Sequence, residues 1–454
     1  MSVFRAYDIR GIVKETLTPE VVIQIGQSIG SEAQAHNQSK VVVARDGRLS
    51  GPDLVRQLIF GLQSTGCEVI DIGMVPTPIL YFATHYLKTG TGVMVTGSHN
   101  PPEYNGFKIM IAGETLSGEG IQALKNRVDQ QNFTVGTGTL HTTDVHHAYV
   151  KRIKKDIKLA RSFKIVVDCG NGVAGMIAPH LFQMLDCDFI PLFCEVDGYF
   201  PNHHPDPSQP KNLQDLIQAV KTHQADLGLA FDGDGDRLGV VDSNGIIIWP
   251  DRQMMLYATD ILKRNPGGKI IYDVKCSRHL ASVIEQQGGE PIMWKTGHSF
   301  VKAKLRTTGA LLAGEMSGHI FFKERWYGFD DALYTAARLL EILAQDTRTP
   351  TEVFASLPNA ISTPELNLNF ANYGEHFEFM DKIRDTFQFA KSTTTTIDGI
   401  RVEFAQGWGL VRPSNTTPCL VIRFEADNQA ALEEIQCQFR QQFLAIDDQL
   451  NLPF

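Results

Sequence analysis

Three aspartates alternate with two glycines in the segment Asp232–Asp236, which reads DGDGD. Carboxylate oxygens are the hard ligands that Mg²⁺ and Ca²⁺ prefer, and the glycines let the backbone fold around an ion. An EF-hand begins in the same way, but Arg237 stands where its glycine belongs and Ser243 where its bidentate glutamate belongs. Three like charges this close repel one another unless a cation neutralises them. We therefore expect a Mg²⁺ site with positions open for water or a phosphate oxygen, in preference to a solvated acidic turn.

A serine stands in an unusual loop after the apolar segment Val93–Val95. The next residues read TGSHNPP, so Ser98 is followed by two prolines that hold the chain extended and prevent an immediate helix. His99 is adjacent in sequence, which rarely gives the geometry of a general base, and the segment has no G-x-S-x-G elbow. A phosphorylated Ser98 would carry about −1.5 to −2 charge, which the metal, Lys108 and Arg237 would neutralise. Taken alone, Ser98 is better explained as a capping or turn serine, and only the aspartate loop makes the phosphoserine the preferred interpretation.

Two further loops carry groups suited to a sugar. Gly314–His319 (GEMSGH) offers a carboxylate, a hydroxyl and an imidazole, and Glu315 beside Ser317 is suited to bind neighbouring sugar hydroxyls. Lys295–Ser299 (KTGHS) contains His298, a candidate general acid or base. The alternative for the first loop is a capped turn, and for His298 an ordinary histidine at a helix start.

A fourth polar loop lies near the carboxyl end of the chain. Arg412–Pro418 (RPSNTTP) combines an arginine with several hydroxyls and backbone amides, a set that suits a phosphate monoester. A polar hairpin loop between strands is an equally good interpretation of this segment by itself.

A glycine pattern typical of dinucleotide binding is also present. Gly170–Gly175 reads GNGVAG directly after an expected strand, and Glu195 lies twenty residues beyond it. A tight strand-to-helix turn explains the same glycines. We prefer the turn, because nicotinamide binding would leave the aspartate, serine and arginine loops unexplained.

These loops need elements that bring them together. Short apolar strands alternate with segments of helical period, which favours an α/β fold made of three similar units. Each special loop follows a strand, and ligands of open parallel sheets bind beyond the carboxyl ends of strands. The expected strands lie within Val41–Arg48, Val93–Asn100, Ile165–Gly172, Leu227–Arg237, Ile270–Ser277 and Leu311–His319.

The last ninety residues have a different pattern. Gly399–Ala426 resembles strands joined by turns, and Leu432–Leu444 has the period of an amphipathic helix, which indicates a separate α+β domain. We therefore expect four domains: 1–144 with the serine loop, 145–247 with the aspartate loop, 248–358 with the sugar loop, and 359–454 with the phosphate loop.

Composition limits the class of protein. The 454 residues carry a net charge of −9, which argues against a general nucleic-acid binder and against binding to an anionic membrane. Seven dispersed cysteines without a Cys-x-x-Cys pair indicate reduced thiols and no zinc site. Arg5, Asp8 and Arg10 interrupt the place of a signal peptide, and no stretch approaches transmembrane length. We expect a cytoplasmic protein, and a monomer is compatible with all these features.

Taken together, the motifs resemble a known family. TGSHNP, DGDGDR, GEMSGH and RPSNTTP occur in the order typical of the α-D-phosphohexomutase superfamily, and FRAYDIRG near the start and FFKERWYGFDD at Phe321–Asp331 add to the likeness. Met316 and His319 in the sugar loop point to the bacterial phosphomannomutase/phosphoglucomutase branch. Pro413 departs from the alanine usual in this branch and removes one backbone N–H. Gly97 replaces an alanine seen in some members.

The resemblance implies four domains around a central active-site cleft and a phosphoserine at Ser98. Ser98 would pass its phosphoryl group to a hexose monophosphate, and the resulting glucose or mannose 1,6-bisphosphate would reorient and return its other phosphate. The implied metal ligands are Ser98, Asp232, Asp234 and Asp236, and the implied catalytic residues are Ser98, Lys108, Arg237 and His298. The implied substrate contacts are Tyr7, Arg10, His99, Asn100, Lys275, Glu315, Ser317, His319, Arg412, Ser414, Asn415 and Thr416. Among these, Glu315 and Ser317 would bind O3 and O4, and the loop after Arg412 would hold the phosphate that does not react.

Three other functions fit parts of the pattern. A phosphoglucosamine mutase of the same superfamily is disfavoured by Met316, where such enzymes typically carry glutamine. A phosphatase would release inorganic phosphate from Ser98. A metal-dependent binding protein would keep the sugar cleft without turnover.

Overall fold

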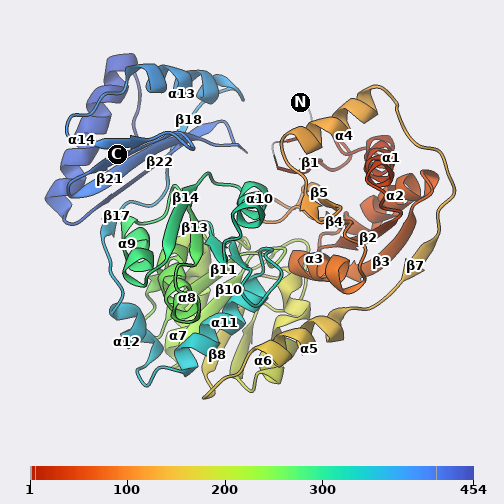
Figure 1. Cartoon of the computed structure of the whole chain (residues 1–454), viewed down its shortest axis with the longest axis horizontal. Helices are drawn as coiled ribbons and strands as arrows, with labels where there is room; N and C mark the ends of the chain where they lie inside the picture. The colour runs from red at the N-terminus through yellow and green to blue at the C-terminus, as the bar shows by residue number, and fades with distance from the viewer. Residues whose placement is uncertain (1–2, 6, 416) are drawn as a thin grey trace.

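The computed structural model describes residues 3–5, 7–415 and 417–454. Four β-sheets follow one another along the chain, each with its own helices (Figure 1). We call the regions around them domains I to IV. In Figure 1 domain IV (blue) lies above the green elements of domain III, and domain I (red to orange) lies to their right.

The sheet of domain I runs in the order β1-β5-β4-β2-β3-β7, with β6 paired to β5. The central strands β3, β2 and β4 are parallel, and β5 pairs antiparallel with β4. The strands are β1 (Ile9–Ile12), β2 (Lys40–Arg45), β3 (Glu68–Met74), β4 (Gly92–Val95), β5 (Tyr104–Ile111), β6 (Glu114–Thr115) and β7 (Leu140–Thr142). The helices are α1 (Pro19–Ala35), α2 (Gly51–Ser64), α3 (Thr77–Tyr86) and α4 (Glu119–Asp129).

Domains II and III repeat this central pattern. Strands β9, β8 and β10 are parallel and β11 returns antiparallel to β10. In the same way β14, β13 and β15 are parallel and β16 returns antiparallel to β15. The strands of domain II are β8 (Lys164–Asp168), β9 (Asp188–Leu192), β10 (Leu227–Phe231), β11 (Leu238–Asp242) and β12 (Ile247–Ile248). Those of domain III are β13 (Lys269–Asp273), β14 (Glu290–Trp294), β15 (Leu312–Gly314) and β16 (Ile320–Phe322). Three similar α/β units with mixed sheets are thereby confirmed.

Helices cover both faces of these two sheets. Those of domain II are α5 (His146–Asp156), η1 (Val173–Met176), α6 (Ala178–Met184), η2 (Pro210–Leu213) and α7 (Gln214–His223). Those of domain III are α8 (Pro250–Arg264), α9 (Arg278–Gln286), α10 (His298–Thr308), α11 (Ala332–Ala344) and α12 (Pro350–Ala355).

Domain IV is built differently, as its sequence predicted. Its sheet is antiparallel throughout, in the order β17-β22-β21-β20-β19 with β18 paired to β22. The strands are β17 (Ile361–Ser362), β18 (Leu366–Asn369), β19 (Thr393–Thr395), β20 (Ile400–Phe404), β21 (Gly407–Pro413) and β22 (Cys419–Ala426). Helices α13 (Glu375–Thr386) and α14 (Gln429–Ile446) accompany it, and α14 contains the predicted helix Leu432–Leu444.

Domains I, II and III share one continuous hydrophobic core, whereas domain IV has its own. The shared core includes aromatic side chains from all three domains: Phe82 packs edge-on against Tyr149, and Trp326 stacks on Tyr334 with ring centroids 4.1 Å apart. Domain IV meets domain III through polar contacts, such as those from Arg401 Nη1 to the carbonyls of Val274 and Cys276, at 2.7 Å each, and through a small apolar cluster of Val274, Trp408 and Leu410. The first three domains therefore form one packed frame.

No helix in the described ranges of the chain is long and apolar enough to span a bilayer.

The glycine-rich segment after β8 makes a structural turn. It leads from β8 into the short 3₁₀ helix η1, and the N–H of Val173 donates to the carbonyl of Gly233 at 3.1 Å. The segment thus packs against the aspartate loop, which supports the interpretation as a strand-to-helix turn.

Candidate active site

The serine, aspartate and sugar loops occupy the same position in the repeated sheet pattern. Residues 96–103 link β4 to β5, residues 232–237 link β10 to β11, and residues 315–319 link β15 to β16. Each loop therefore begins at the carboxyl end of a parallel strand and turns back into an antiparallel one. Equivalent topology places the three loops at equivalent sheet edges, which is how motifs more than 200 residues apart come together.

Ser98 is buried beside the aspartate loop. Its Oγ lies 3.3 Å from Asp232 Oδ2 and 3.2 Å from His99 Nδ1, and the residue is 2% exposed. Its φ of +49° lies in the left-handed region, where side chains other than glycine are uncommon. The Ser98 N–H donates to Thr96 Oγ1 at 2.8 Å. This strained but fully bonded conformation fixes where the hydroxyl points.

Arg48, which sequence reasoning missed, clamps the serine loop from behind. Its Nη2 donates to the carbonyls of Ser98, at 2.8 Å, and Asn100, and its Nη1 donates to two further loop carbonyls. Asp46 holds the other side, because its Oδ2 accepts hydrogen bonds from Thr96 Oγ1 and the Gly97 N–H and lies 3.3 Å from Arg48 Nε. A Cβ at residue 97 would come within 2.4 Å of that Nε, so an alanine there would force the Arg48 guanidinium to shift.

The three aspartates of the second loop form a compact buried cluster. Asp232, Asp234 and Asp236 are 0% exposed, and one carboxylate oxygen from each lies within 4.8 Å of the others. Lys108 Nζ donates to Asp234 Oδ2 at 2.7 Å and to Asp236 Oδ2 at 2.6 Å. The second oxygens, Oδ1 of Asp234 and Asp236, have no hydrogen-bond donor in the described structure. Buried, unpartnered carboxylate oxygens beside a third carboxylate are a donor set that fits a divalent cation.

Electrostatics show the same need for positive charge. Burial, together with the neighbouring carboxylates of Asp236 and Asp234, raises the pKa of Asp232 well above its usual range. Burial alone would also raise the pKa of Asp234, but Lys108 outweighs it and holds that pKa below the ordinary value. Burial disfavours the Lys108 ammonium, yet its two carboxylate partners keep the pKa of Lys108 well above the usual range. One lysine therefore does not neutralise all three aspartates.

Arg237 connects the aspartate loop to the sugar loop. Its Nε donates to His319 Nε2 at 3.0 Å and lies 3.7 Å from Asp232 Oδ2. On the other side of the imidazole, His319 Nδ1 lies 3.0 Å from Asp330 Oδ2 and 3.5 Å from Asp236 Oδ1. His319 thus acts as a bridge between the two loops, with an acceptor nitrogen toward Arg237.

His298 is the first residue of α10 and faces the same cluster. Its ring stacks on His319 with centroids 5.5 Å apart, and its Nδ1 lies 3.9 Å from Asp330 Oδ2. Burial, with the nearby Lys302 ammonium, lowers the pKa of His298 well below its usual range. The imidazole is therefore neutral at physiological pH and able to accept a proton.

The sugar loop is folded around its own carboxylate. Glu315 Oε1 accepts a hydrogen bond from the Gly297 N–H at 2.5 Å, and Ser317 Oγ donates to Glu315 Oε2 at 3.2 Å. Burial raises the pKa of Glu315 above its ordinary value. The Glu315–Ser317 pair predicted from sequence is therefore a real contact, held against the start of α10.

Cations predicted to hold phosphate already have carboxylate partners. Lys275 Nζ lies 2.7 Å from Glu365 Oε1, and Arg412 Nε lies 2.8 Å from Asp398 Oδ2. Ser414 Oγ lies 2.8 Å from Thr417 Oγ1. Thr416, the remaining predicted contact, lies outside the described residues. The described part of the phosphate loop thus places the Arg412 guanidinium, paired with a carboxylate, and the hydroxyls of Ser414 and Thr417 at the end of β21.

Residues near the amino terminus reach both the serine loop and the phosphate loop. Arg10 Nη1 donates to Asn100 Oδ1 at 2.6 Å. Tyr7 OH donates to the Thr296 carbonyl at 3.4 Å and accepts a hydrogen bond from Asn415 Nδ2. Domain IV therefore contacts domain I directly through Tyr7.

One series of contacts joins all four loops. It runs from Ser98 to Asp232, then through Arg237 to His319, whose ring stacks on His298, and from there through Tyr7 to the phosphate loop. Other predicted site residues lie beside this series: Lys108 binds Asp234 and Asp236, Arg10 binds Asn100, and Lys275 pairs with Glu365. The supporting residues that sequence reasoning missed are Asp46, Arg48, Thr77, His204, Lys302, Asp330, Glu365 and Asp398.

Substituting Gly233 by alanine should separate the aspartate loop from the serine loop. A Cβ there would lie 2.4 Å from the Ser98 carbonyl, and the loop cannot retreat because Gly233 also bonds Pro205 and Val173 through its backbone. A displacement of about 1 Å can cost about 100-fold in rate. We expect at least that loss in kcat with a lowered melting temperature. Gly51→Ala, whose Cβ would meet nothing closer than 3.1 Å, should change neither, and equal behaviour of both variants would contradict the packing described here.

Comparison with known families agrees with this architecture of four domains around one set of loops. Models of the phosphoglucomutase/phosphomannomutase family match residues 1–135 (alpha/beta/alpha domain I), 147–245 (domain II), 249–361 (domain III) and 366–442 (C-terminal domain). Fold and site together therefore define a member of the α-D-phosphohexomutase superfamily. More specifically, the chain belongs to the phosphoglucomutase/phosphomannomutase family.

Individual relatives cover the whole chain. It is 57% identical over 453 residues to a phosphomannomutase/phosphoglucomutase of Pseudomonas aeruginosa, covering 100% of this chain and 98% of that one. It is 54% identical over 441 residues to a phosphoglucomutase of Neisseria meningitidis, covering 96% of each. The crystal structure of a phosphoglucomutase/phosphomannomutase family protein from Burkholderia thailandensis superposes with a TM-score of 0.95 at 54% identity, covering 100% of this chain and 99% of that one.

Proposed function

We propose that this protein is a phosphohexomutase that interconverts the 1-phosphate and 6-phosphate of mannose and of glucose. The observation that supports this most strongly is the placement of Ser98 Oγ 3.3 Å from a buried cluster of three carboxylates with unpartnered oxygens. A serine hydroxyl in that position is suited to carry a phosphoryl group whose charge a metal neutralises. Family membership over the full chain supports the same reaction.

In the proposed reaction Ser98 carries the phosphoryl group. The bond between phosphorus and Ser98 Oγ breaks, a bond forms to the free hydroxyl of the hexose monophosphate, and a proton leaves that hydroxyl. The resulting hexose 1,6-bisphosphate reorients by about half a turn in the site, and its other phosphoryl group is transferred to Ser98. Glucose or mannose 1,6-bisphosphate would therefore also act as an activator that phosphorylates Ser98.

The chain supplies positioning and charge for this transfer. Mg²⁺ bound by Ser98 and the three aspartates would neutralise charge on the transferring group. Arg237 and Lys108 would stabilise that group or assist proton transfer. His298, which is neutral, is placed to take or return the proton of the sugar hydroxyl.

Substrate contacts account for activity on two sugars. Glu315 and Ser317 would bind O3 and O4, while Arg412, Ser414, Asn415, Thr416 and Lys275 would hold the phosphate that does not react. Tyr7, Arg10, His99, Asn100 and His319 would line the space between. Mannose and glucose differ only at C2, so a site that anchors O3, O4 and phosphate discriminates weakly between them.

We also infer a cytoplasmic, monomeric protein whose domains divide near residues 144, 247 and 358. A net charge of −9 and free cysteines throughout support a reducing compartment and argue against nucleic acid as a partner.

Phosphorus NMR on mannose 1-phosphate tests the proposed function. With Mg²⁺ and a trace of glucose 1,6-bisphosphate, we expect mannose 6-phosphate to accumulate without inorganic phosphate. Accumulation of inorganic phosphate would instead make the protein a phosphatase, and conversion of glucosamine phosphates alone would leave the reaction but change the substrate.

A further inference from the structure

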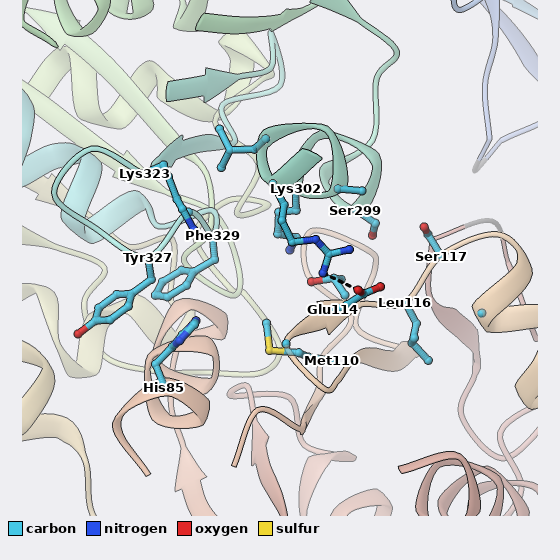
Figure 2. A pocket seen from close by; sticks show the side chains of 17 residues that line it. His85, Met110, Glu114, Leu116, Ser117, Ser299, Lys302, Lys323, Tyr327 and Phe329 are labelled. Atoms are coloured by element: carbon cyan, nitrogen blue, oxygen red, sulfur yellow. Dashed lines mark ion pairs between the residues drawn. The ribbon is translucent and has the colours of Figure 1, made fainter. Parts of the chain in front are cut away.

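A cavity lies between domains I and III, and no residue of the four loops lines it. Its volume is about 300 Å³, which is within the range of small-molecule sites. Domain I contributes the β5–β6 hairpin and the start of α4, and domain III contributes one face of α10 and the segment 323–329 (Figure 2). No residue of the proposed catalytic set lines this space.

The charged lining of this cavity has an excess of positive charge. Arg306 Nη1 is paired with Glu114 Oε1 at 2.7 Å, and Lys302 Nζ with Asp330 Oδ1 at 2.8 Å. Lys323 is exposed, and no carboxylate of the described residues lies within 4.0 Å of its ammonium. One lysine charge is therefore left without a protein counter-ion at this cavity.

Hydroxyl groups line the same space. Ser299 is 1% exposed, and its Oγ has no hydrogen-bond partner in the described structure. A buried hydroxyl without a partner has lost its hydrogen bonds to water, so a ligand that bonds to it gains affinity. Ser117 and Thr115 add two further hydroxyls to the lining.

A flat aromatic surface forms the other side. The His85 ring stacks on Tyr327 with centroids 4.9 Å apart, and Tyr327 lies nearly parallel to Phe329 with centroids 5.8 Å apart. Figure 2 shows these three rings together at one side of the cavity and Ser117 and Ser299 at the other. Burial, together with Lys323, lowers the pKa of His85, so its ring is neutral and suited to stack on a ligand.

We propose that this cavity binds a small organic dianion that carries a flat ring and a phosphate or phosphonate group. The ring packs against the aromatic group of His85, Tyr327 and Phe329, the anionic group takes the Lys323 ammonium beside these rings, and the far end of the ligand reaches the hydroxyls of Ser117 and Ser299 (Figure 2). Phosphate or phosphonate suits the unpaired ammonium better than a single carboxylate because it carries more negative charge on oxygens that accept charge-assisted hydrogen bonds. None of the residues of the proposed catalytic set lines this cavity, and binding there does not require the mutase reaction to occur.

Calorimetric titration of phenylphosphonate into the full-length protein tests this proposal. The probe has a ring and a dianion, and its C–P bond prevents phosphoryl transfer. We expect Lys323→Gln to weaken binding about tenfold through loss of a charge-assisted contact. Ala303→Leu fills the cavity from an exposed helical position and should weaken binding at least as much.

Two matched variants serve as controls. Lys382→Gln removes an exposed lysine in domain IV, and Thr307→Leu enlarges an exposed residue of the same helix α10 that does not line the cavity. Both should bind phenylphosphonate as the parent does. Absence of binding at millimolar concentration, or equal affinity in the parent and both cavity variants, would overturn the proposal, since binding would then be absent or confined to the catalytic loops.

Discussion

Replacing Ser98 by alanine should reduce mutase turnover by about 10⁴-fold or more while leaving the fold intact. The substitution removes the only atom of Ser98 that reaches Asp232, whereas the backbone bonds from Arg48 and to Thr96 that hold the loop stay in place. Removal of a covalent nucleophile commonly costs this much, because no other group can form the intermediate. Turnover of mannose 1-phosphate and the thermal midpoint measure the two effects separately.

The control for this variant is a serine outside the site. Ser282→Ala, at an exposed position of α9, should keep full activity and the same thermal midpoint. Mass spectrometry of the parent should find a phosphoryl group that the Ser98→Ala protein lacks. Turnover above one hundredth of the parent rate in Ser98→Ala would show that Ser98 does not carry the phosphoryl group.

Replacing Lys108 by methionine should produce the largest loss of stability among single substitutions at the site, together with a greater dependence on Mg²⁺. Lys108 is 4% exposed and bonds two carboxylates at 2.7 and 2.6 Å. Removing one partner of a buried ion pair typically costs about 3–5 kcal/mol, because the remaining charges are left unpaired. Since a cation that binds the folded state stabilises it by mass action, Mg²⁺ should recover more of the thermal midpoint in this variant than in the parent.

Lys40→Met provides a matched control on the surface. Lys40 pairs with Glu68 at 3.1 Å, but both side chains are well exposed, and such pairs contribute about 0–1 kcal/mol. We expect a small change in its thermal midpoint and the parental response to Mg²⁺. If Mg²⁺ shifted the midpoints of Lys108→Met and the parent by the same amount, the aspartate cluster would not be the site of cation binding.

The central elements of the site could be predicted because their signals are local. Neighbouring residues are enough to indicate the chemistry of three motifs: the glycine-spaced aspartates, the serine before two prolines and the Glu-x-Ser pair. The strand before each of these loops places it at a sheet edge. The α/β units and the separate α+β fourth domain followed from periodicity for the same reason. What the family resemblance added was the way in which these loops act together.

The supporting residues could not be predicted because their partners are distant in sequence. Arg48 holds a loop 50 residues away, and Thr77 donates to Asp234 Oδ2 across 157 residues. Nothing near Arg48 distinguishes it from a surface arginine, although it is among the most deeply buried side chains of the protein. Asp330 is the exception, because it stands in the FFKERWYGFDD segment that contributed to the resemblance.

The acidic partners of the phosphate-binding cations were also beyond sequence reasoning. Glu365 reaches Lys275 across 90 residues, and Asp398 pairs with Arg412 across a strand turn. A phosphate that binds to these cations must compete with, or join, a carboxylate already in place. The charge of the phosphate loop is therefore set by contacts between domains III and IV as much as by the loop itself.

The division of the hydrophobic core determines which domains can move relative to one another. Rearranging domains I, II and III would expose the aromatic cluster around Trp326. The serine, aspartate and sugar loops are therefore expected to keep fixed positions relative to one another. Domain IV carries its own core and meets domain III through polar contacts and one small apolar cluster around Trp408, so moving it would expose less apolar surface. The bisphosphate intermediate must reverse its orientation in the site, and this arrangement suits that step. Domains I to III hold the reacting groups in place, while domain IV can loosen its hold on the sugar phosphate without releasing it to solvent.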